Sequence, residues 1–145
     1  MPRILVPVDG SEASMRAVRH VIGLKSALKQ ALDVQVLNVQ PPVPAKLLLF
    51  EGRPSDIRRL EEPARAHGAE IQAAAKSALD GAGIENTLHV EIGETAPAIS
   101  AFARSHHCEM IVMGTRGAGS VAGLILGSIS HKVVHLSSVP VLLVP

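Results

Sequence analysis

The residues best suited to chemistry are a group of glycines and serines in the last third of the chain. Gly114 and Gly117 are separated by two residues, and Gly127-Ser128 follows nine residues after Gly117. Glycine lets backbone N–H groups turn toward a ligand without an intervening side chain, and successive exposed amides form an anion-binding concavity. Gly127-Ser128 also opens an expected helix, where free N–H groups and the helix dipole favour phosphate. The pattern therefore indicates phosphate binding.

Three side chains could strengthen such a site. The hydroxyls of Ser128 and Ser130 can donate hydrogen bonds, and Arg116 can neutralise phosphate charge through a bidentate contact. The residues alone also allow a second interpretation, in which the glycines only form a tight, flexible loop.

Two common nucleotide motifs do not fit. Residues 117–122 nominally match G-x-G-x-x-A, but they lie late in the chain and no acidic residue follows them. A dinucleotide fingerprint needs one about 20 positions on. The sequence has no G-x-x-x-x-G-K-[ST], which excludes a Walker P-loop.

Short apolar segments and amphipathic helices alternate along the chain. Segments typical of strands in a parallel sheet occur at residues 4–8, 34–39, 87–92, 110–113 and 139–144. Helices are expected at residues 15–28, 63–79, 97–105 and 127–136. Ser11 is suited to cap the first helix, and Pro63 to begin the second. The alternation predicts a single α/β domain over residues 1–145 with a five-stranded parallel sheet. Residues 45–62 are expected to be mainly a long connection.

Composition narrows the class of protein. The 145 residues suffice for one domain, and the formal net charge is +1. An even balance of 14 basic and 13 acidic residues, with only two Phe and no Trp or Tyr, argues against binding to nucleic acid or an anionic membrane. No signal peptide or membrane-spanning apolar run is visible. Because the single cysteine, Cys108, cannot form an internal disulfide, these features favour the cytoplasm.

Several titratable side chains have a simpler interpretation than catalysis. His131 and His135 lie four residues apart on a helix, as two metal ligands could, but no third ligand is evident. Cys108 begins an apolar segment and is expected to pack as a small hydrophobe. Asp9 directly follows the first strand and is either a turn former or a ligand-binding residue.

Three segments together resemble the universal stress protein family. Its nucleotide-binding members carry G, two residues, G, nine residues and then G-[ST], a spacing matched here by Gly114, Gly117, Gly127 and Ser128. The chain also contains Ile4-Leu5-Val6-Pro7-Val8-Asp9-Gly10-Ser11 and, later, Val139-Pro140-Val141-Leu142-Leu143-Val144. The resemblance covers nearly the whole chain, whereas residues 45–62 have no reliable match.

The resemblance implies a doubly wound sheet in the order 3-2-1-4-5 with helices on both faces, the adenine nucleotide alpha hydrolase-like fold. It implies ATP as the ligand, with Mg²⁺ as an accompanying ion, at the carboxyl ends of strands one and four, where the strand order reverses. By similarity, the adenosine side would be formed by Pro7, Val8, Asp9, Val39, Met113 and Gly114. The phosphates would be held by Gly117, Gly127, Ser128, Ile129 and Ser130. The charge and position of Arg116, and not the resemblance, indicate that it would also contact the phosphates.

The resemblance also implies a stress-response switch or adaptation module that forms a homodimer. Residues 139–144 would be an apolar edge strand, which needs pairing or cover. Two alternatives remain open, an interaction protein of the same fold without nucleotide and a slow ATPase. The intact glycine pattern argues against the first. For the second, no catalytic base is evident beyond Asp9, so any hydrolysis would be slow.

Overall fold

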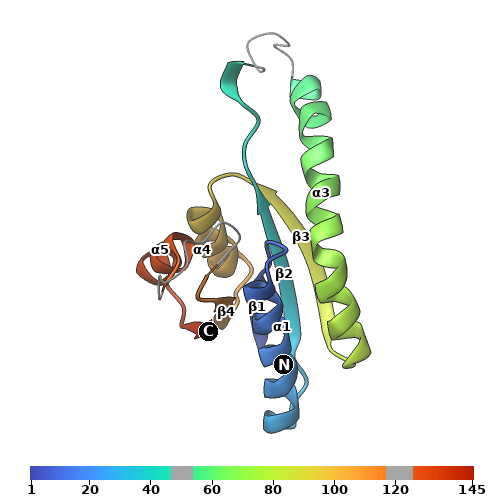
Figure 1. Ribbon diagram of the computed structural model, residues 1–145, viewed down its shortest axis with the longest axis vertical. Coiled ribbons are helices and arrows are strands. Elements are labelled where there is room, and N and C mark those ends of the chain that lie inside the picture. The colour runs from blue at the N-terminus through green and yellow to red at the C-terminus, as the bar shows by residue number, and fades with distance from the viewer. Residues whose placement is uncertain (47–53, 117–125) are drawn as a thin grey trace.

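A five-stranded parallel sheet organises the computed structural model, which describes residues 1–46, 54–116 and 126–145. The strands are β1 (Arg3–Pro7), β2 (Asp33–Gln40), β3 (Glu85–Ile92), β4 (Met110–Gly114) and β5 (Val141–Val144). They lie in the order β3-β2-β1-β4-β5, and every neighbouring pair is parallel (Figure 1). This confirms the expected order, with its reversal between β1 and β4.

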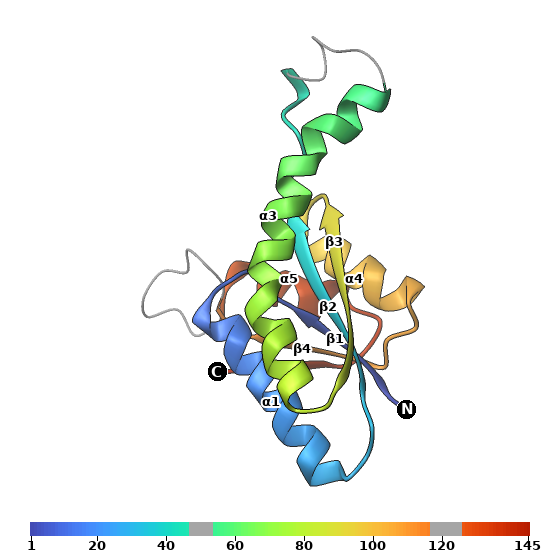
Figure 2. The same cartoon turned by 90° about the vertical axis from the view of Figure 1, so that its right-hand side faces the viewer.

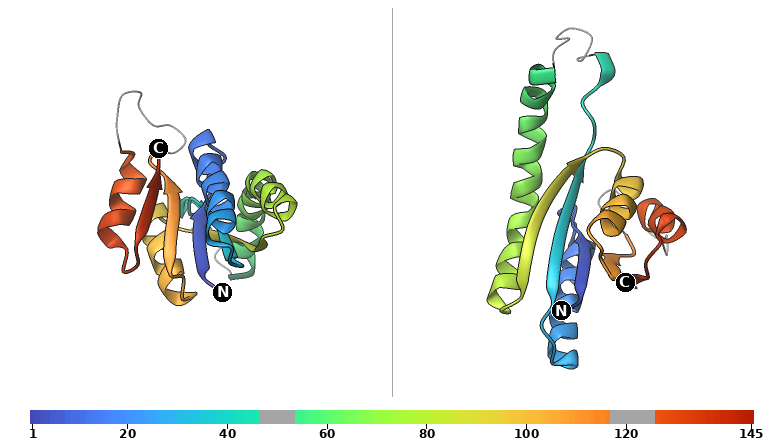
Figure 3. Two further views of the ribbon diagram at one scale, coloured as in Figure 1. Left: turned by 90° about the horizontal axis from the view of Figure 1, so that it is seen from below. Right: turned by 180° about the vertical axis from the view of Figure 1, so that it is seen from behind.

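Helices cover both faces of the sheet. α1 (Glu12–Leu28) and α3 (Pro54–Gly81) pack on one face, whereas α4 (Thr95–Ser105) and α5 (Ser128–Leu136) pack on the other. Figure 3 shows these layers from below and from behind. Among the described residues, no helix has the length and apolar character needed to cross a membrane.

Alternation of side chains along the strands divides the core into two halves. Val6 and Val36 point to the α1–α3 face, whereas Leu5, Leu37 and Ile111 point to the α4–α5 face, and all five are 0% exposed. Each such side chain stabilises the fold by about 1.5–3 kcal/mol through burial. Because both faces are covered, β1 and β4 contain continuous apolar runs, whereas the apolar run of β2 is interrupted by the buried Gln35 and Asn38.

Local signals set the ends of the helices. The hydroxyl oxygen of Ser11 accepts a hydrogen bond from the backbone N–H of Ser14 at 3.1 Å, so Ser11 caps α1 as expected. Gly83 follows α3 with a φ of +66°, a left-handed conformation that L side chains rarely adopt. The predicted Ser11 cap is therefore observed, and Gly83 supplies the turn that follows α3.

The second helix is longer than the sequence predicts. α3 begins at Pro54, and Pro63 lies inside the helix rather than at its first position. An interior proline removes one backbone hydrogen bond and costs about 3 kcal/mol. The flanking Arg, Leu, Glu and Ala residues are strong helix formers, so the helix continues through it. Figure 2 shows the first turns of α3 inclined to the rest, as expected near a proline. Residues 47–53 of the predicted connection lie outside the described residues.

Two strands begin two residues away from the prediction, whereas every other strand end lies within one residue of it. β3 begins at Glu85 rather than at residue 87, and β5 begins at Val141 rather than at residue 139. Pro140 explains the later start of β5, because proline has no N–H to donate to a ladder.

A polar network crosses the α4–α5 face near the start of the strands. The Asp33 carboxylate accepts hydrogen bonds from Arg3 Nε and from Gln35 Nε2, each at 2.7 Å. The Gln35 Oε1 atom lies 2.8 Å from His89 Nε2. Because the Gln35 amide nitrogen is used by Asp33, its oxygen is the acceptor and His89 Nε2 carries the proton. The His89 ring also meets the Phe102 ring edge-on, with centroids 4.7 Å apart.

This network predicts a pH dependence of stability. Burial, followed by the nearby His106 ring, lowers the pKa of His89, against upward effects of Glu91 and Asp33. The unfolded chain therefore binds a proton at His89 at a higher pH than the folded chain does. Stability should consequently fall as the pH drops from about 7 to about 5, through the ordinary histidine pKa.

We expect His89→Gln to make this decline in melting temperature less steep, as measured by differential scanning calorimetry across that pH range. The exposed His20 offers a matched control, because His20→Gln removes an imidazole from the surface of α1. Equal slopes for His89→Gln and the wild type would contradict the assignment.

Candidate functional site

The carboxyl ends of β1, β2 and β4 face the same edge of the sheet as the start of α5. β1 is followed by Val8 and Asp9, and β4 by Thr115 and Arg116. The strand order reverses between β1 and β4, and open α/β sheets form ligand-binding crevices at such a point. Of the predicted site residues, only Gly117 lies outside the described residues.

An apolar surface lines this edge on the α4–α5 face. Pro7, Val39 and Met113 each lie two residues beyond a strand residue buried on that face, so their side chains share it. Met113 belongs to the core there, and Val39 and Ile129 pack against that core. Three adjacent strands and one helix therefore contribute apolar side chains to one area.

Gly114 ends β4 where the first turn of α1 comes closest. A Cβ atom at this position would lie 2.8 Å from the carbonyl oxygen of Ala13 and 2.9 Å from its Cβ. Such distances are too short for real Cβ contacts, and two of the three obstructing atoms belong to the Ala13 backbone. Glycine is therefore required here for steric reasons, whatever the ligand.

Two hydrogen bonds fix the start of α5 to the end of β4, and a third ties that end to β5. The buried Ser130 hydroxyl donates to the Gly114 carbonyl at 2.8 Å, and the Gly127 N–H donates to the Thr115 carbonyl at 2.6 Å. The Thr115 N–H in turn donates to Val144 at 3.0 Å. As donors, the Ser130 hydroxyl and the Gly127 amide are thus engaged inside the protein, and they position the helix.

The N-terminus of α5 is left without a side-chain cap. Its N-cap residue is Gly127, and no side chain of the described residues bonds to the first amides. The N–H groups of Ser128, Ile129 and Ser130 have no partner within the helix, because the first intrahelical bond runs from His131 N to Gly127 O at 3.0 Å. The Ser128 and Arg116 side chains are exposed. This helix start can therefore accept an anion.

Asp9 has at least one structural role. Its Oδ1 atom accepts a hydrogen bond from the Ser11 N–H at 2.9 Å, which forms a turn between β1 and α1. Asp9 is exposed at the site edge. The turn-former interpretation is thus observed, and a ligand-binding role remains a prediction.

Metal binding has no support from the titratable side chains at residues 1–46, 54–116 and 126–145. Within the described residues, no group of three or more His, Cys, Asp or Glu side chains could hold a metal ion. Cys108 is buried, and burial raises the pKa of its thiol to about 11. It packs in the α4–α5 core as a small hydrophobe, as predicted.

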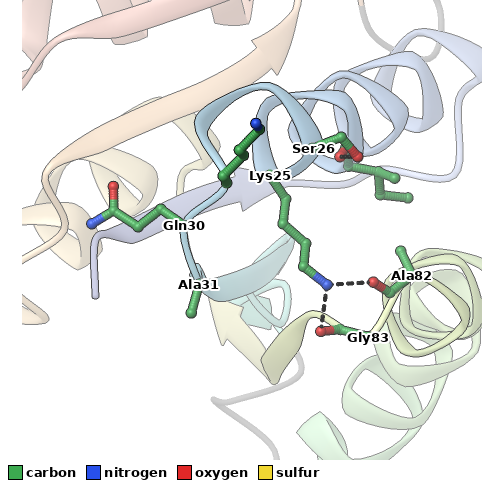
Figure 4. Close-up of a pocket in the computed structure, with 8 residues that line it drawn as sticks. Lys25, Ser26, Gln30, Ala31, Ala82 and Gly83 are labelled. Carbon is green, nitrogen blue, oxygen red and sulfur yellow. Dashed lines mark hydrogen bonds between the residues drawn. The ribbon is translucent and has the colours of Figure 1, made fainter.

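A surface hollow lies at the opposite edge of the sheet (Figure 4). It has a volume of about 580 Å³, and its lining residues are Ile22, Lys25, Ser26, Lys29, Gln30, Ala31, Ala82 and Gly83. Lys25 Nζ donates to the carbonyl oxygens of Ala82 at 2.7 Å and Gly83 at 2.9 Å. This ammonium group satisfies carbonyls at the end of α3, so its position has a structural explanation.

Comparisons with known proteins agree with this architecture. The model of the universal stress protein family matches residues 1–145. A universal stress protein of Thermus aquaticus is 37% identical over 141 residues, which cover 97% of this chain and 96% of the relative. The chain belongs to the universal stress protein family. Among solved structures, that of the hypothetical protein MJ0577 superposes with a TM-score of 0.83 at 24% identity, covering 99% of this universal stress protein and 94% of the other chain.

Some structural neighbours contain adenine nucleotides. A universal stress protein from Arabidopsis thaliana with AMP bound has a TM-score of 0.71 at 17% identity, covering 99% of this chain and 91% of its own. Other universal stress protein structures hold cAMP or dAMP. At these identities the likeness shows the fold.

Sequence reasoning missed two residues that shape this edge. Asn38 is 2% exposed, and its side chain donates a hydrogen bond to the Val8 carbonyl. Ala13 contributes the α1 backbone that lies against Gly114. Asn38 could have been identified from the sequence, because it is a polar residue inside the apolar run Val36-Leu37-Asn38-Val39. For Ala13 there was no signal, since its role depends on a contact distant in sequence.

The packing of Gly114 gives a stability prediction. We expect Gly114→Ala to destabilise the protein by about 1–3 kcal/mol, because the added methyl must displace backbone of α1. Gly23→Ala is the control, since nothing lies within 4 Å of the added Cβ and alanine favours a helix interior by about 0.5–1 kcal/mol. Urea denaturation measures both changes. A Gly114→Ala variant as stable as the wild type would refute the close contact.

Proposed function

We propose that this universal stress protein binds ATP at the carboxyl ends of β1 and β4. The main support is that an apolar surface and an uncapped helix start occur at the same edge. The apolar surface is built by Pro7, Val39 and Met113, and the helix begins after Gly127. Adenosine needs the first feature and phosphate the second. The nucleotides in the structural neighbours, AMP, dAMP and cAMP, also carry adenine.

The adenosine would be held by the three strand ends. Adenine would lie against Val39, whose backbone polar groups can read the edge of the ring, while Pro7, Val8 and Met113 supply apolar contact. The exposed Asp9 carboxylate, which accepts from the Ser11 N–H in the turn after β1, would lie near a ribose hydroxyl. Gly114 would lie beneath the nucleoside, although its missing side chain makes room for Ala13 of α1 and not for the ligand.

The phosphates would meet the start of α5. The free amides of Ser128, Ile129 and Ser130, together with the helix dipole, favour negative charge. Arg116 and Gly117 precede this helix in the chain, and Arg116 would neutralise phosphate charge. Mg²⁺ would accompany ATP through its phosphate oxygens, with water as its other ligands.

The cellular role that fits these features is a single-domain, cytoplasmic switch or adaptation module whose state depends on ATP. No described residue other than Asp9 is placed as a general base at this edge, and Asp9 forms a turn. Any ATP hydrolysis would therefore be slow, and binding is the proposed activity. A nucleotide-free interaction protein of the same fold is the alternative that a binding measurement excludes.

The first test is calorimetric titration with ATP and with adenosine. At about 100 times its Kd, ATP should stabilise the protein by about 2.7 kcal/mol, seen as a higher melting temperature. Gly117→Val should abolish ATP binding, because its side chain would stand where phosphate must approach, while the fold stays intact. Gly23→Ala serves as a control that leaves the site unchanged. Absence of heat and of thermal stabilisation at millimolar ATP would refute the proposal.

A homodimer through β5 is part of the proposed function. β5 is an edge strand whose four residues are all partly exposed. The carbonyls of Pro140 and Val144 accept from β4, so the backbone groups of Val141 and Leu143 face outward. Two such edges can pair antiparallel about a twofold axis.

We therefore expect light scattering to give a dimeric mass at micromolar concentration. Val141→Pro should shift the mass toward the monomer, because it removes an outward N–H. Circular dichroism should show that the variant is folded. Leu142→Lys is a poorer probe, since Leu142 packs against the α1–α3 core. A monomeric wild type would overturn the dimer.

A further inference from the structure

A buried amide next to the proposed site holds the end of β1. Asn38 is 2% exposed, although it lies in the apolar strand β2. Its Nδ2 atom donates to the Val8 carbonyl at 2.8 Å, and the Val8 N–H donates to the Leu37 carbonyl at 2.8 Å. Since β1 ends at Pro7, both polar groups of Val8 are held by β2 at the point where the chain turns toward Asp9.

The orientation of this amide is fixed from two sides. The Asn38 Oδ1 atom accepts a hydrogen bond from Gln40 Nε2 at 2.8 Å, which leaves Nδ2 directed at Val8. Gly68 of α3 lies directly over the amide, where a Cβ atom would come within 2.8 Å of Oδ1. The side chain therefore cannot rotate without moving α3 or breaking buried hydrogen bonds.

This amide connects two walls of the proposed site. Asp9 follows Val8, and Val39 follows Asn38 with its side chain on the opposite face of β2. The distance between Asp9 and Val39 thus depends on the Asn38–Val8 hydrogen bond. We propose that Asn38 is a positioning residue, which fixes the Val8–Asp9 turn and thereby the adenosine side of the site. Its effect on ligands rests on the proposed nucleotide binding.

Gln72 allows this role to be separated from a purely structural one. It is another buried amide on the α1–α3 side, 1% exposed, and its Nε2 atom donates to the carbonyls of Val36 at 3.2 Å and His89 at 2.6 Å. Gln72 therefore ties α3 to the middle of β2 and β3, away from the Val8–Asp9 turn. Asn38→Asp and Gln72→Glu both replace a buried amide by a carboxyl group, the first beside the Val8–Asp9 turn and the second away from it.

The experiment compares the Kd values of ATP and adenosine for these variants and the wild type. Asn38→Asp should raise both values by the same factor, about tenfold or more, because a buried carbonyl loses its donor and the adenosine side loosens. Gln72→Glu should lower the melting temperature and leave both Kd values unchanged. In Asn38→Asp, a protonated carboxyl group could still donate to the Val8 carbonyl, so Asn38→Leu, which has no donor, serves as a second variant. It should raise both Kd values as Asn38→Asp does.

Amide hydrogen exchange provides a readout that needs no ligand. In Asn38→Asp and Asn38→Leu, the Ser11 and Ser14 amides should exchange faster, whereas in Gln72→Glu they should not. Unchanged Kd values or unchanged exchange in both Asn38 variants would overturn the proposal. If the wild type binds neither ATP nor adenosine, the proposed function fails, and the exchange rates alone decide whether Asn38 fixes the turn.

Discussion

The close approach of Gly114 to the first turn of α1 sets the geometry of the whole edge. With no Cβ between them, the end of β4 and the backbone of Ala13 come into direct contact. The Gly114 and Thr115 carbonyls are then free to accept from Ser130 and Gly127, which seats α5. A larger residue would push α1 and β4 apart and, through these bonds, would shift α5. The sheet order alone does not bring these elements so close.

Buried amide side chains supply hydrogen bonds that the aliphatic side chains of the core cannot make. Val, Leu and Ile fill both faces of the sheet, but their side chains cannot act as hydrogen-bond donors to buried carbonyls at strand ends and under helices. Asn38 and Gln72 supply those donors on the α1–α3 side, and Gln35 links Asp33 to His89 on the other face. An unpaired buried carbonyl costs about 1–3 kcal/mol. Each amide thus stabilises one arrangement of strands and helices.

Much of the fold could be predicted from the sequence, because its signals are local. β-Branched runs mark the strands, and Ser11 caps α1 where expected. The order of the strands required the family resemblance, since periodicity cannot determine it. The start of α3 was predicted nine residues too late, because Pro63 suits a first helical turn and the tolerance of an interior proline depends on its neighbours.

Less of the site could be predicted, for a different physical reason. The sequence indicates which residues reach the carboxyl edge, and Pro7, Val39 and Met113 do share one face there. It does not indicate which polar groups are already paired. The Ser130 hydroxyl is chemically able to donate a hydrogen bond to phosphate, yet in the structure it donates to the Gly114 carbonyl. Such pairing depends on contacts between residues distant in the sequence.

The two halves of the proposed site differ in how firmly they are held. Pro7, Val39 and Met113 belong to adjacent strands of a parallel sheet, so their relative positions are fixed by backbone ladders and by the Asn38 amide. The start of α5 is tied to the Gly114 and Thr115 carbonyls by two hydrogen bonds, and Val133 anchors the helix in the α4–α5 core. A perturbation of those two carbonyls would therefore act directly on the start of α5, and it would reach Pro7 and Val39 only through the sheet. The fold thus places the proposed base-binding surface on adjacent strands of the sheet, whereas the proposed phosphate end depends on how α5 is seated.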